Sequence, residues 1–421
     1  MNSFKKHFLF SILLISFNWL SSQDTLKIMS YNILNFSSND PSKSRYLDIK
    51  TILQNANPDA VMLCEISSLG APQLLLDSAF NMAGIGTFTR SVFYDGPDTD
   101  NILYYKTSKL KLRSQKQINT TLRDISQYLI YKVVAPNDTA FVYLHMSHLK
   151  AGSLASDEFQ RLSEVSAFCT DIAPIPQGAN IVFSGDFNLK SNIEAAYTTL
   201  TSANCSHVFL DPINMPGVWN NNSTFKSIHT QSTRTSSFPG CCGGSTGGMD
   251  DRFDFIMVTN PVMNGNNKVT YVPGSYKAYG NDGQHMNKAI TEAPANSVVP
   301  ANVAQALFNV SDHLPVIMKL AFRPSEVGIK KNSQNNSNFK IWAVANAGGN
   351  YLAISAKKTD TYKLNIVDIA GKIIYDQTIE LKEGYQTIEL TNMNLKNAIY
   401  QAILINDTDV SRCLLPINAP N

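Results

Sequence analysis

Five short polar motifs constrain this chain more than any other feature of its sequence. Four of them place carboxylate, amide or histidine groups beside an apolar run, and the other directly follows one. An apolar run that ends in such a group is typical of a core strand with a ligand at its exposed end. Hard oxygen donors gathered in this way suit Mg²⁺ or Mn²⁺ better than they suit a thiolate-bound metal. In chain order the motifs are Ser30-Tyr31-Asn32-Ile33, Leu63-Cys64-Glu65-Ile66, Gly185-Asp186-Phe187-Asn188-Leu189, Arg252-Phe253-Asp254-Phe255-Ile256 and Ser311-Asp312-His313-Leu314-Pro315.

Strand and helix patterns alternate between residues 26 and 323, which predicts an α/β domain. Two stretches, 211–250 and 273–310, show no periodicity, and loops of that length are usually functional or disordered. The expected helices are 45–56 and 157–172, and the expected strands are 26–33, 60–66, 102–105, 128–134, 140–147, 180–184, 253–259 and 314–322.

Taken singly, each polar motif is weak evidence for function. Asn32 at a strand end could simply cap a turn. Glu65 ends an apolar run and is costly to desolvate unless it is paired or metal-bound. Asp254 lies inside an apolar run, so we expect it to have a histidine or metal partner. Asp312 and His313 place an acid and a base just before the last predicted strand.

In combination and in this order, the motifs resemble those of the endonuclease/exonuclease/phosphatase superfamily, the deoxyribonuclease I-like metallophosphoesterases. The resemblance covers residues 24–323, and Gly-Asp-Phe-Asn and Ser-Asp-His-Leu-Pro are its most specific elements. It implies a four-layered α/β sandwich with two packed mixed β-sheets and a site at one end. It also implies metal-dependent hydrolysis of a phosphodiester bond.

The resemblance further implies a division of labour between cation binding and proton transfer. Asn32, Glu65 and Asp312 are expected to bind the metal ion. His313 is expected to be the catalytic base, with Asp254 orienting it. Mg²⁺ or Mn²⁺ is the expected cofactor, and Ca²⁺ in a structural role is left open.

The remaining site residues are expected to hold the phosphate. Asp186 and Asn188 resemble the pair that positions the phosphate and the nucleophile. His148 resembles the second active-site histidine, and Arg123 the phosphate-contacting arginine. His145 lies three residues before His148 on a predicted strand, so the two face opposite sides, and we expect His145 to be structural.

The substrate is less well defined than the chemistry. Inositol-polyphosphate phosphatases of the superfamily carry a Trp where this chain has Ser184, which disfavours that branch. A net charge of +2 neither indicates nor excludes nucleic-acid binding. We expect DNA or RNA as the substrate, and the alternatives are a sphingomyelinase-like or other phospholipid or sugar-phosphate phosphodiesterase and an inactive surface-binding protein. Loop bases could contact a phosphate backbone, or could be scattered solvated charges: Lys226, His229, Arg234, Lys277 and Lys288.

Both ends of the chain indicate export. Lys5 and Lys6 precede the apolar stretch 8–19, and small serines follow, which is the pattern of a signal peptide over residues 1–22. The polar segment 324–340 predicts a linker, and the alternation beyond it predicts an all-β domain over 341–421.

This C-terminal domain resembles the sorting domains of the type IX secretion system, through 364–374 and 395–400. It departs from them in having Asn346-Ala347 in place of the usual Asn-Pro and Ala398 in place of the usual Gly. An adhesion or carbohydrate-binding β-sandwich is the alternative. We expect a secreted or cell-surface monomer whose C-terminal domain contacts the secretion machinery.

Export would permit disulfides among the six cysteines. Cys64 and Cys169 lie in apolar runs, where we expect buried thiols. Cys205 could pair with Cys241 or Cys242, or these two adjacent residues could pair with each other.

Overall fold

The computed structural model describes residues 24–237, 241–324, 338–346, 349–368, 371–390, 393, 395–396, 398–406 and 409–417. The predicted signal peptide, and most of the predicted linker, therefore lie outside the described residues. The chain divides into two units, Met1–Ser325 and Glu326–Asn421, and each is described by itself.

Two mixed β-sheets form the centre of the larger unit. The first has the strand order β11-β13-β1-β2-β4-β3, with β12 paired to β13, and the second has the order β5-β6-β7-β8-β10-β9. One pair in each sheet is parallel, β1 with β2 and β7 with β8. The strands are β1 (Asp24–Phe36), β2 (Ala60–Ile66), β3 (Phe88–Arg90), β4 (Asp100–Lys106), β5 (Lys111–Ile118), β6 (Ile125–Ala135), β7 (Asp138–His148), β8 (Ile181–Asp186), β9 (Phe209–Leu210), β10 (Asp254–Thr259), β11 (Val269–Tyr271), β12 (Lys277–Ala278) and β13 (Val316–Phe322).

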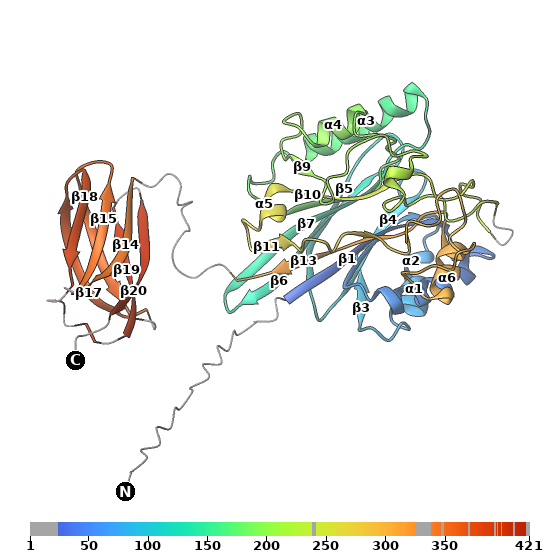
Figure 1. The fold of residues 1–421 in the computed structure, drawn as a ribbon. Coiled ribbons are helices and arrows are strands. Elements are labelled where there is room, and N and C mark those ends of the chain that lie inside the picture. The colour runs from blue at the N-terminus through green and yellow to red at the C-terminus, as the bar shows by residue number, and fades with distance from the viewer. Residues whose placement is uncertain are drawn as a thin grey trace, which may run out of the picture. The chain divides into compact units, whose positions relative to one another are not determined.

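Helices cover the outer face of each sheet, as Figure 1 shows. On the first sheet, Ile52 of α1 and Leu307 of α6 share an apolar cluster with Leu63. On the second sheet, Phe168 of α3 packs against Phe183. A further cluster joins the inner faces of the two sheets. This is the predicted four-layered α/β sandwich. The helices are α1 (Tyr46–Ala56), α2 (Ala71–Leu75), α3 (Ala155–Asp171), α4 (Ala195–Leu200), α5 (Asn260–Asn264) and α6 (Ala301–Val310).

The predicted helices and strands are present, and several elements were missed. The stretch 273–310, predicted to lack regular structure, contains α6, which buries Val303 and Leu307. That prediction is wrong because the helical run is short and follows a long Pro- and Asn-rich loop. β5 was missed because it is an edge strand whose side chains are mostly exposed or half-buried, so it lacks a clear alternation.

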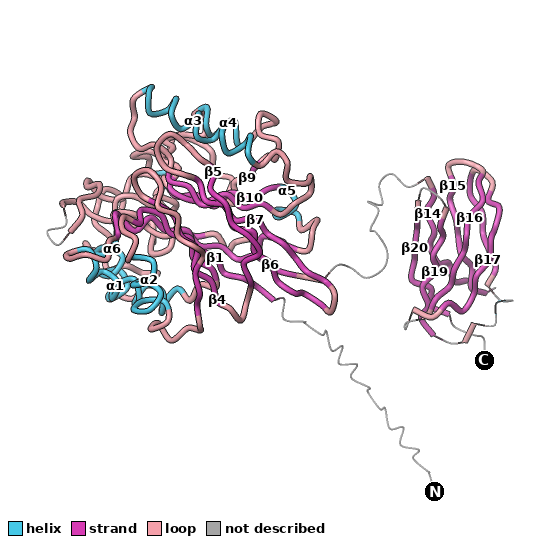
Figure 2. The backbone as a smooth tube through the Cα atoms, turned by 180° about the vertical axis from the view of Figure 1, so that it is seen from behind, coloured by secondary structure: helices cyan, strands magenta, loops and turns pink. Residues whose placement is uncertain are grey.

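The smaller unit consists of two antiparallel sheets, of orders β14-β15-β18 and β17-β16-β19-β20 (Figure 2). Leu352, Leu364 and Leu404 belong to one apolar cluster that both sheets share. The predicted C-terminal all-β domain is therefore present. Its resemblance to sorting domains stays a prediction, and residues 369–370 and 397 of the resembling segments lie outside the described residues. The strands are β14 (Phe339–Asn346), β15 (Gly349–Ala356), β16 (Asp360–Val367), β17 (Ile373–Leu381), β18 (Gly384–Glu389), β19 (Ala398–Ile405) and β20 (Val410–Ile417).

Cys169 of α3 is bonded to Cys205, so the predictions of a free Cys169 thiol and of a Cys205 bond to Cys241 or Cys242 are wrong. The two residues meet because α3 and α4 pack on the same sheet, which a separation of 36 residues does not reveal. Cys241 and Cys242 are bonded to each other, and Cys64 is a buried thiol as predicted. Within the described ranges, no helix is both long and apolar enough to cross a membrane.

Replacing Cys205 by Ala is expected to lower the free energy of unfolding by about 3–4 kcal/mol, because the bond restricts the unfolded chain. Urea denaturation of the full chain under oxidising conditions, followed through the unfolding of the larger unit, measures the loss. Cys413→Ala, which removes a thiol in the smaller unit, is the control. Unchanged stability of Cys205→Ala would show that the bond does not form in solution.

Candidate active site

A row of polar side chains crosses three neighbouring strands of the second sheet. His148 ends β7, Asp186 ends β8 and Asp254 begins β10. In the sheet, Asp186 is in register with His148 on one side and with Asp254 on the other. Partners in register share a face of a sheet, so the three side chains lie side by side.

The Gly-Asp-Phe-Asn motif owes its glycine to close packing of β7 and β8. A Cβ on Gly185 would lie 1.9 Å from the Ser147 carbonyl oxygen, and the residue has φ +137°. Only glycine fits here. Beyond it, Asn188 adopts the left-handed conformation at φ 52°, donates its N–H to Asp186 Oδ1 at 3.0 Å and its Nδ2 to the Leu149 oxygen at 3.1 Å.

The first sheet contributes Asn32 and Glu65 through irregular backbone. Glu65 has φ 62°, and the pairing of β2 with both its neighbours shifts beside it. Such irregularities re-aim a side chain, and strain of this kind clusters at functional sites. Asn32 Nδ2 donates to Glu65 Oε1 at 2.7 Å and to Asp186 Oδ2 at 3.0 Å, which links the two sheets.

His313 lies between two carboxylates of the second sheet. Its Nδ1 is 2.8 Å from Asp254 Oδ2, and its Nε2 is 3.5 Å from Asp186 Oδ2. Burial lowers the pKa of His313, but the charges of Asp254, Asp186 and Asp312 outweigh burial and raise that pKa well above its ordinary value. Burial raises the pKa of Asp186 to about 7, against the opposing effect of His313. The sequence-based expectation of a histidine partner for Asp254 therefore matches the geometry.

A glycine-rich loop holds Asp312. The Ser245 N–H donates to Asp312 Oδ2 at 2.6 Å. A Cβ on Gly244 would lie 2.9 Å from Asp312 Cγ, and Gly244 has φ +96°, so the loop needs glycine to pass this close. The loop thus fixes one oxygen of a carboxylate that was predicted to bind a cation.

Two buried arginines hold the end of α6, from which the Ser-Asp-His motif begins. Arg234 Nε donates to the Phe308 oxygen at 2.7 Å, and Arg45 Nη1 donates to the Val310 oxygen at 2.5 Å. Cationic side chains suit the unpaired carbonyls at a helix C-terminus. Arg234 is 1% exposed and His229 is 0% exposed. The hypothesis that these two side chains contact the phosphate backbone of a nucleic acid is therefore wrong.

The polar side chains of the motifs converge on one cavity of about 430 Å³. Arg123 also faces it, and its Nε donates to Asp98 Oδ2 at 2.8 Å. Asn32 and Asp254 lie behind the lining, and buried His145 is bonded elsewhere, to Gln127 and the Val182 oxygen. Of the predicted site residues, the cavity is lined by Glu65, Arg123, His148, Asp186, Asn188, Asp312 and His313.

Several other lining residues were not singled out from the sequence, among them Lys190, Gln231 and Ser245. Lys190 follows the Gly-Asp-Phe-Asn-Leu motif directly, and its Nζ lies 5.3 Å from the centre of the Phe253 ring. Gln231 and Ser245 come from the long aperiodic stretch, where no local pattern marks them. Only the position of Lys190 beside a motif could have drawn attention to it.

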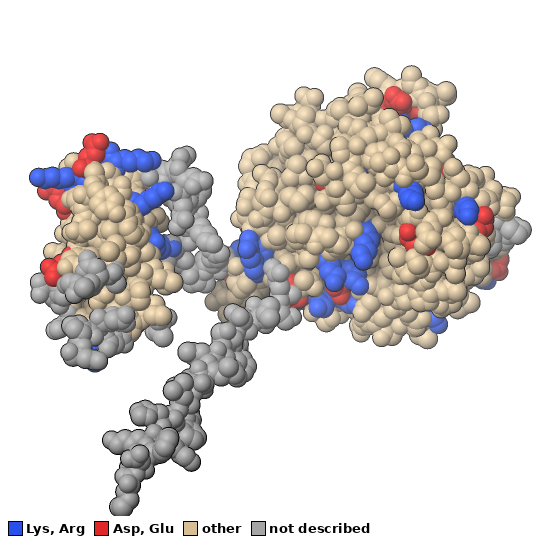
Figure 3. Space-filling view, viewed as in Figure 1, with Lys and Arg blue, Asp and Glu red and all other residues tan. Residues whose placement is uncertain are grey.

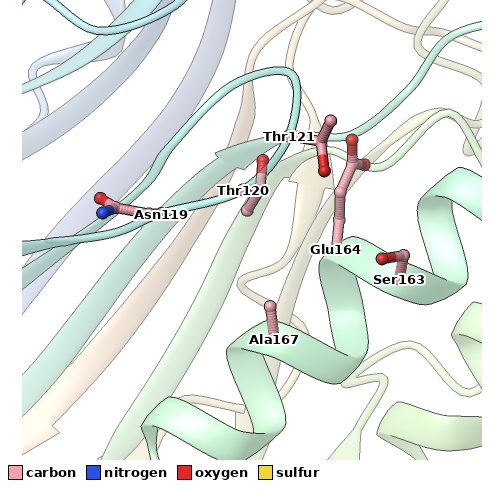
Figure 4. Close-up of a pocket in the computed structure, with 6 residues that line it drawn as sticks. All are labelled: Asn119, Thr120, Thr121, Ser163, Glu164 and Ala167. Carbon is pink, nitrogen blue, oxygen red and sulfur yellow. The ribbon is translucent and has the colours of Figure 1, made fainter.

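A second pocket of about 260 Å³ lies beside the loop that carries Arg123 (Figure 4). Asn119, Thr120 and Thr121 form one wall, and α3 forms the other through Ser163 and Glu164. Glu164 Oε2 accepts the Lys150 N–H at 3.0 Å, so this carboxylate is already used to hold the turn after β7. The pocket offers hydroxyl and amide groups and lacks the acid–histidine set of the main cavity.

The donor set fits a divalent cation. One ligand atom each from Glu65, His148 and Asp186 lies within 4.8 Å of the others. Burial raises the pKa of Glu65, and His148 Nδ1 is buried without a hydrogen-bond partner. Burial, with the charges of Arg123 and His313, lowers the pKa of His148 well below its ordinary value, which favours the neutral imidazole. A cation would reduce the repulsion between the buried carboxylates and would bind the unpaired Nδ1 of His148.

No protein-family model matches the chain, and no curated protein matches it. Among solved structures, it resembles an endonuclease/exonuclease/phosphatase from Bacteroides vulgatus, at 16% identity and TM-score 0.45 over 71% of this chain and 99% of that one. It also resembles D. rerio TDP2 complexed with single-strand DNA product, at 15% identity and TM-score 0.44 over 70% and 98%. A third is an endonuclease/exonuclease/phosphatase from Beutenbergia cavernae, at 14% identity and TM-score 0.43 over 94% of this chain and 99% of that one. Likenesses this distant do not bear on substrate or mechanism.

Two candidate ligand sets can be separated by Mn²⁺ titration. Glu65→Gln is expected to weaken Mn²⁺ binding in either case, because Glu65 belongs both to the predicted Asn32–Glu65–Asp312 set and to the Glu65–His148–Asp186 group. If the first set binds the ion, Asp312→Asn weakens binding by roughly tenfold or more and His148→Ala does not. If the second set binds the ion, His148→Ala weakens binding by roughly tenfold or more and Asp312→Asn does not. Unchanged affinity in all three variants would show that the ion binds elsewhere.

Proposed function

We propose that this protein is a secreted, divalent-metal-dependent phosphodiesterase whose substrate is extracellular nucleic acid. The observation that carries the proposal is the convergence of three predicted carboxylates, Glu65, Asp186 and Asp312, with an arginine and two histidines on one cavity. One of those histidines is paired with Asp254 behind the lining. Such a set can neutralise phosphate charge and activate water in the same place.

His313 serves as the base. In the neutral ring, Nδ1–H donates to Asp254, because a carboxylate oxygen only accepts, and this leaves Nε2 to accept a proton. The carboxylates that raise the pKa of His313 favour the imidazolium, and a divalent cation among them would favour the neutral ring that acts as the base. Asp254 fixes the orientation of the ring and stabilises the imidazolium that forms. In the proposed reaction Nε2 takes the proton of the water that attacks phosphorus.

The phosphate is held by neutral and cationic donors. His148, in its neutral form, can donate a hydrogen bond to a phosphoryl oxygen, and Asn188 can donate another. Arg123 lines the cavity, and its guanidinium, whose Nη1 is buried without a hydrogen-bond partner, adds positive charge beside the phosphate position. A divalent ion held by Glu65 and its neighbours, when bound, draws charge from a non-bridging oxygen.

We favour nucleic acid over other phosphodiesters as the substrate because two basic side chains, Arg123 and Lys190, line the cavity. The signal-peptide pattern favours an extracellular substrate. Elsewhere, basic side chains form separate groups with acidic ones among them on the face shown in Figure 3. Export, by the N-terminal pattern and the resemblance to sorting domains, is part of the proposal. Mg²⁺ is the proposed cofactor, and the protein is proposed to act as a monomer.

A phospholipid phosphodiesterase is the second candidate, and two exposed apolar side chains favour it. Leu154 is 68% exposed and follows Ser153, which lines the cavity. Ile193 is 76% exposed and lies three residues after Lys190. Apolar side chains beside a phosphate site suit a lipid surface.

Assays of the purified protein with Mg²⁺, Mn²⁺ or EDTA decide between these proposals. Hydrolysis of plasmid DNA or RNA that EDTA abolishes supports the nuclease. Preference for micellar sphingomyelin supports the lipid enzyme. Activity that persists in EDTA contradicts the metal-dependent mechanism for either substrate.

Replacing His313 by Ala is expected to lower kcat by three orders of magnitude or more, about 4 kcal/mol in the activation barrier, because the base is lost. His285→Ala is the matched control. His285 forms a similar buried pair with Asp282 at 2.8 Å, outside the cavity. Near wild-type hydrolysis by His313→Ala, with metal present and the fold intact by circular dichroism, would falsify the assignment of the base.

A further inference from the structure

Gln231 lies between the two halves of the site, and the mechanism above does not use it. It belongs to the long segment between β9 and β10, is 8% exposed and lines the cavity. Its Nε2 is 2.7 Å from Nε2 of His313 and 3.3 Å from Oδ2 of Asp312. One amide nitrogen therefore contacts both the proton-accepting atom and a carboxylate on the cation side.

The backbone holds Gln231 in this place. Its N–H donates to the Asp251 oxygen at 3.0 Å, and its oxygen accepts the N–H groups of Asp250 at 2.7 Å and Asp251 at 2.8 Å. The residue also forms an isolated β-bridge with His313. The amide is thus presented from a fixed backbone that is itself paired with the residue it contacts.

The direction of the contact follows from the donors and acceptors. His313 Nδ1 must donate, because Asp254 Oδ2 only accepts. The amide nitrogen of Gln231 can only donate, so the contact requires the neutral imidazole, which accepts the bond at Nε2; the contact thereby opposes the carboxylate charges that raise the pKa of His313. Gln231 therefore occupies the lone pair that has to receive a proton from water.

We infer that Gln231 is a positioning residue for His313. Its amide turns Nε2 of the ring toward the cavity, ties the ring to Asp312, and yields the bond to Nε2 when the attacking water binds. The contact with Asp312 Oδ2 then keeps the amide at the site. The water's role rests on the proposed function, whereas the positioning of the ring does not.

The test compares Gln231→Met, which keeps the length of the side chain and removes its hydrogen bonds, with Gln127→Met. Gln127 is a matched control because it is 7% exposed and its Oε1 lies 3.1 Å from Nε2 of His145, outside the cavity. Gln231→Met is expected to lower kcat about 10–100-fold with little change in KM, as loss of an outer-shell partner does. Gln127→Met is expected to leave both values unchanged, and Gln231→Asn to restore part of kcat.

A second measurement needs no activity. In ¹H–¹⁵N spectra of the metal-free protein, the Nδ1–H signal of His313, assigned with His313→Asn, is expected to broaden or shift in Gln231→Met only. An unchanged signal in Gln231→Met, or an equal change in Gln127→Met, overturns the inference. If the wild type hydrolyses no phosphodiester, the proposed function fails, and the spectra still decide whether Gln231 positions the ring.

Discussion

The burial of four carboxylates in one region is the constraint on which the rest of the site depends. Taking an ion out of water costs several kcal/mol unless partners replace the water. Glu65 and Asp186 share the Asn32 amide, Asp254 is paired with His313, and Asp312 accepts the N–H of a loop residue. No carboxylate of the set is left to solvent, so each fixes the position of another element.

The sandwich satisfies this constraint by bringing strand ends together. The pairing of β7, β8 and β10 sets His148, Asp186 and Asp254 in one row, and the irregular ends of β1 and β2 turn Asn32 and Glu65 toward it. The hydrogen bond from Asn32 to Asp186 crosses between the sheets. Fold and site are therefore coupled, because the apolar layers between the sheets set the distance that this bond spans.

Site residues whose burial in an apolar run is costly could be predicted from the sequence around them. An aspartate inside an apolar run needs a partner, and Asp254 has His313. The contributions of Gln231 and Ser245 depend on where a long loop passes, and nothing in the loop's own sequence sets that path. Arg234 resembled a solvated base until the fold placed the end of α6 against it. The sequence revealed which groups are costly to bury, and tertiary contacts decide which groups compensate them.

The two candidate ligand sets differ in what has to move. Asn32 presents its N–H groups to Glu65 and Asp186, while its Oδ1 accepts the Leu34 N–H at 3.0 Å. Turning the amide over to offer Oδ1 to a cation would leave that backbone N–H without its acceptor, at a cost of about 1–3 kcal/mol. The Glu65–His148–Asp186 group requires no such rotation, and His148 Nδ1 is already without a partner. The geometry thus favours this group, and a cation on Asn32 has to recover the cost through its contact with Asp312.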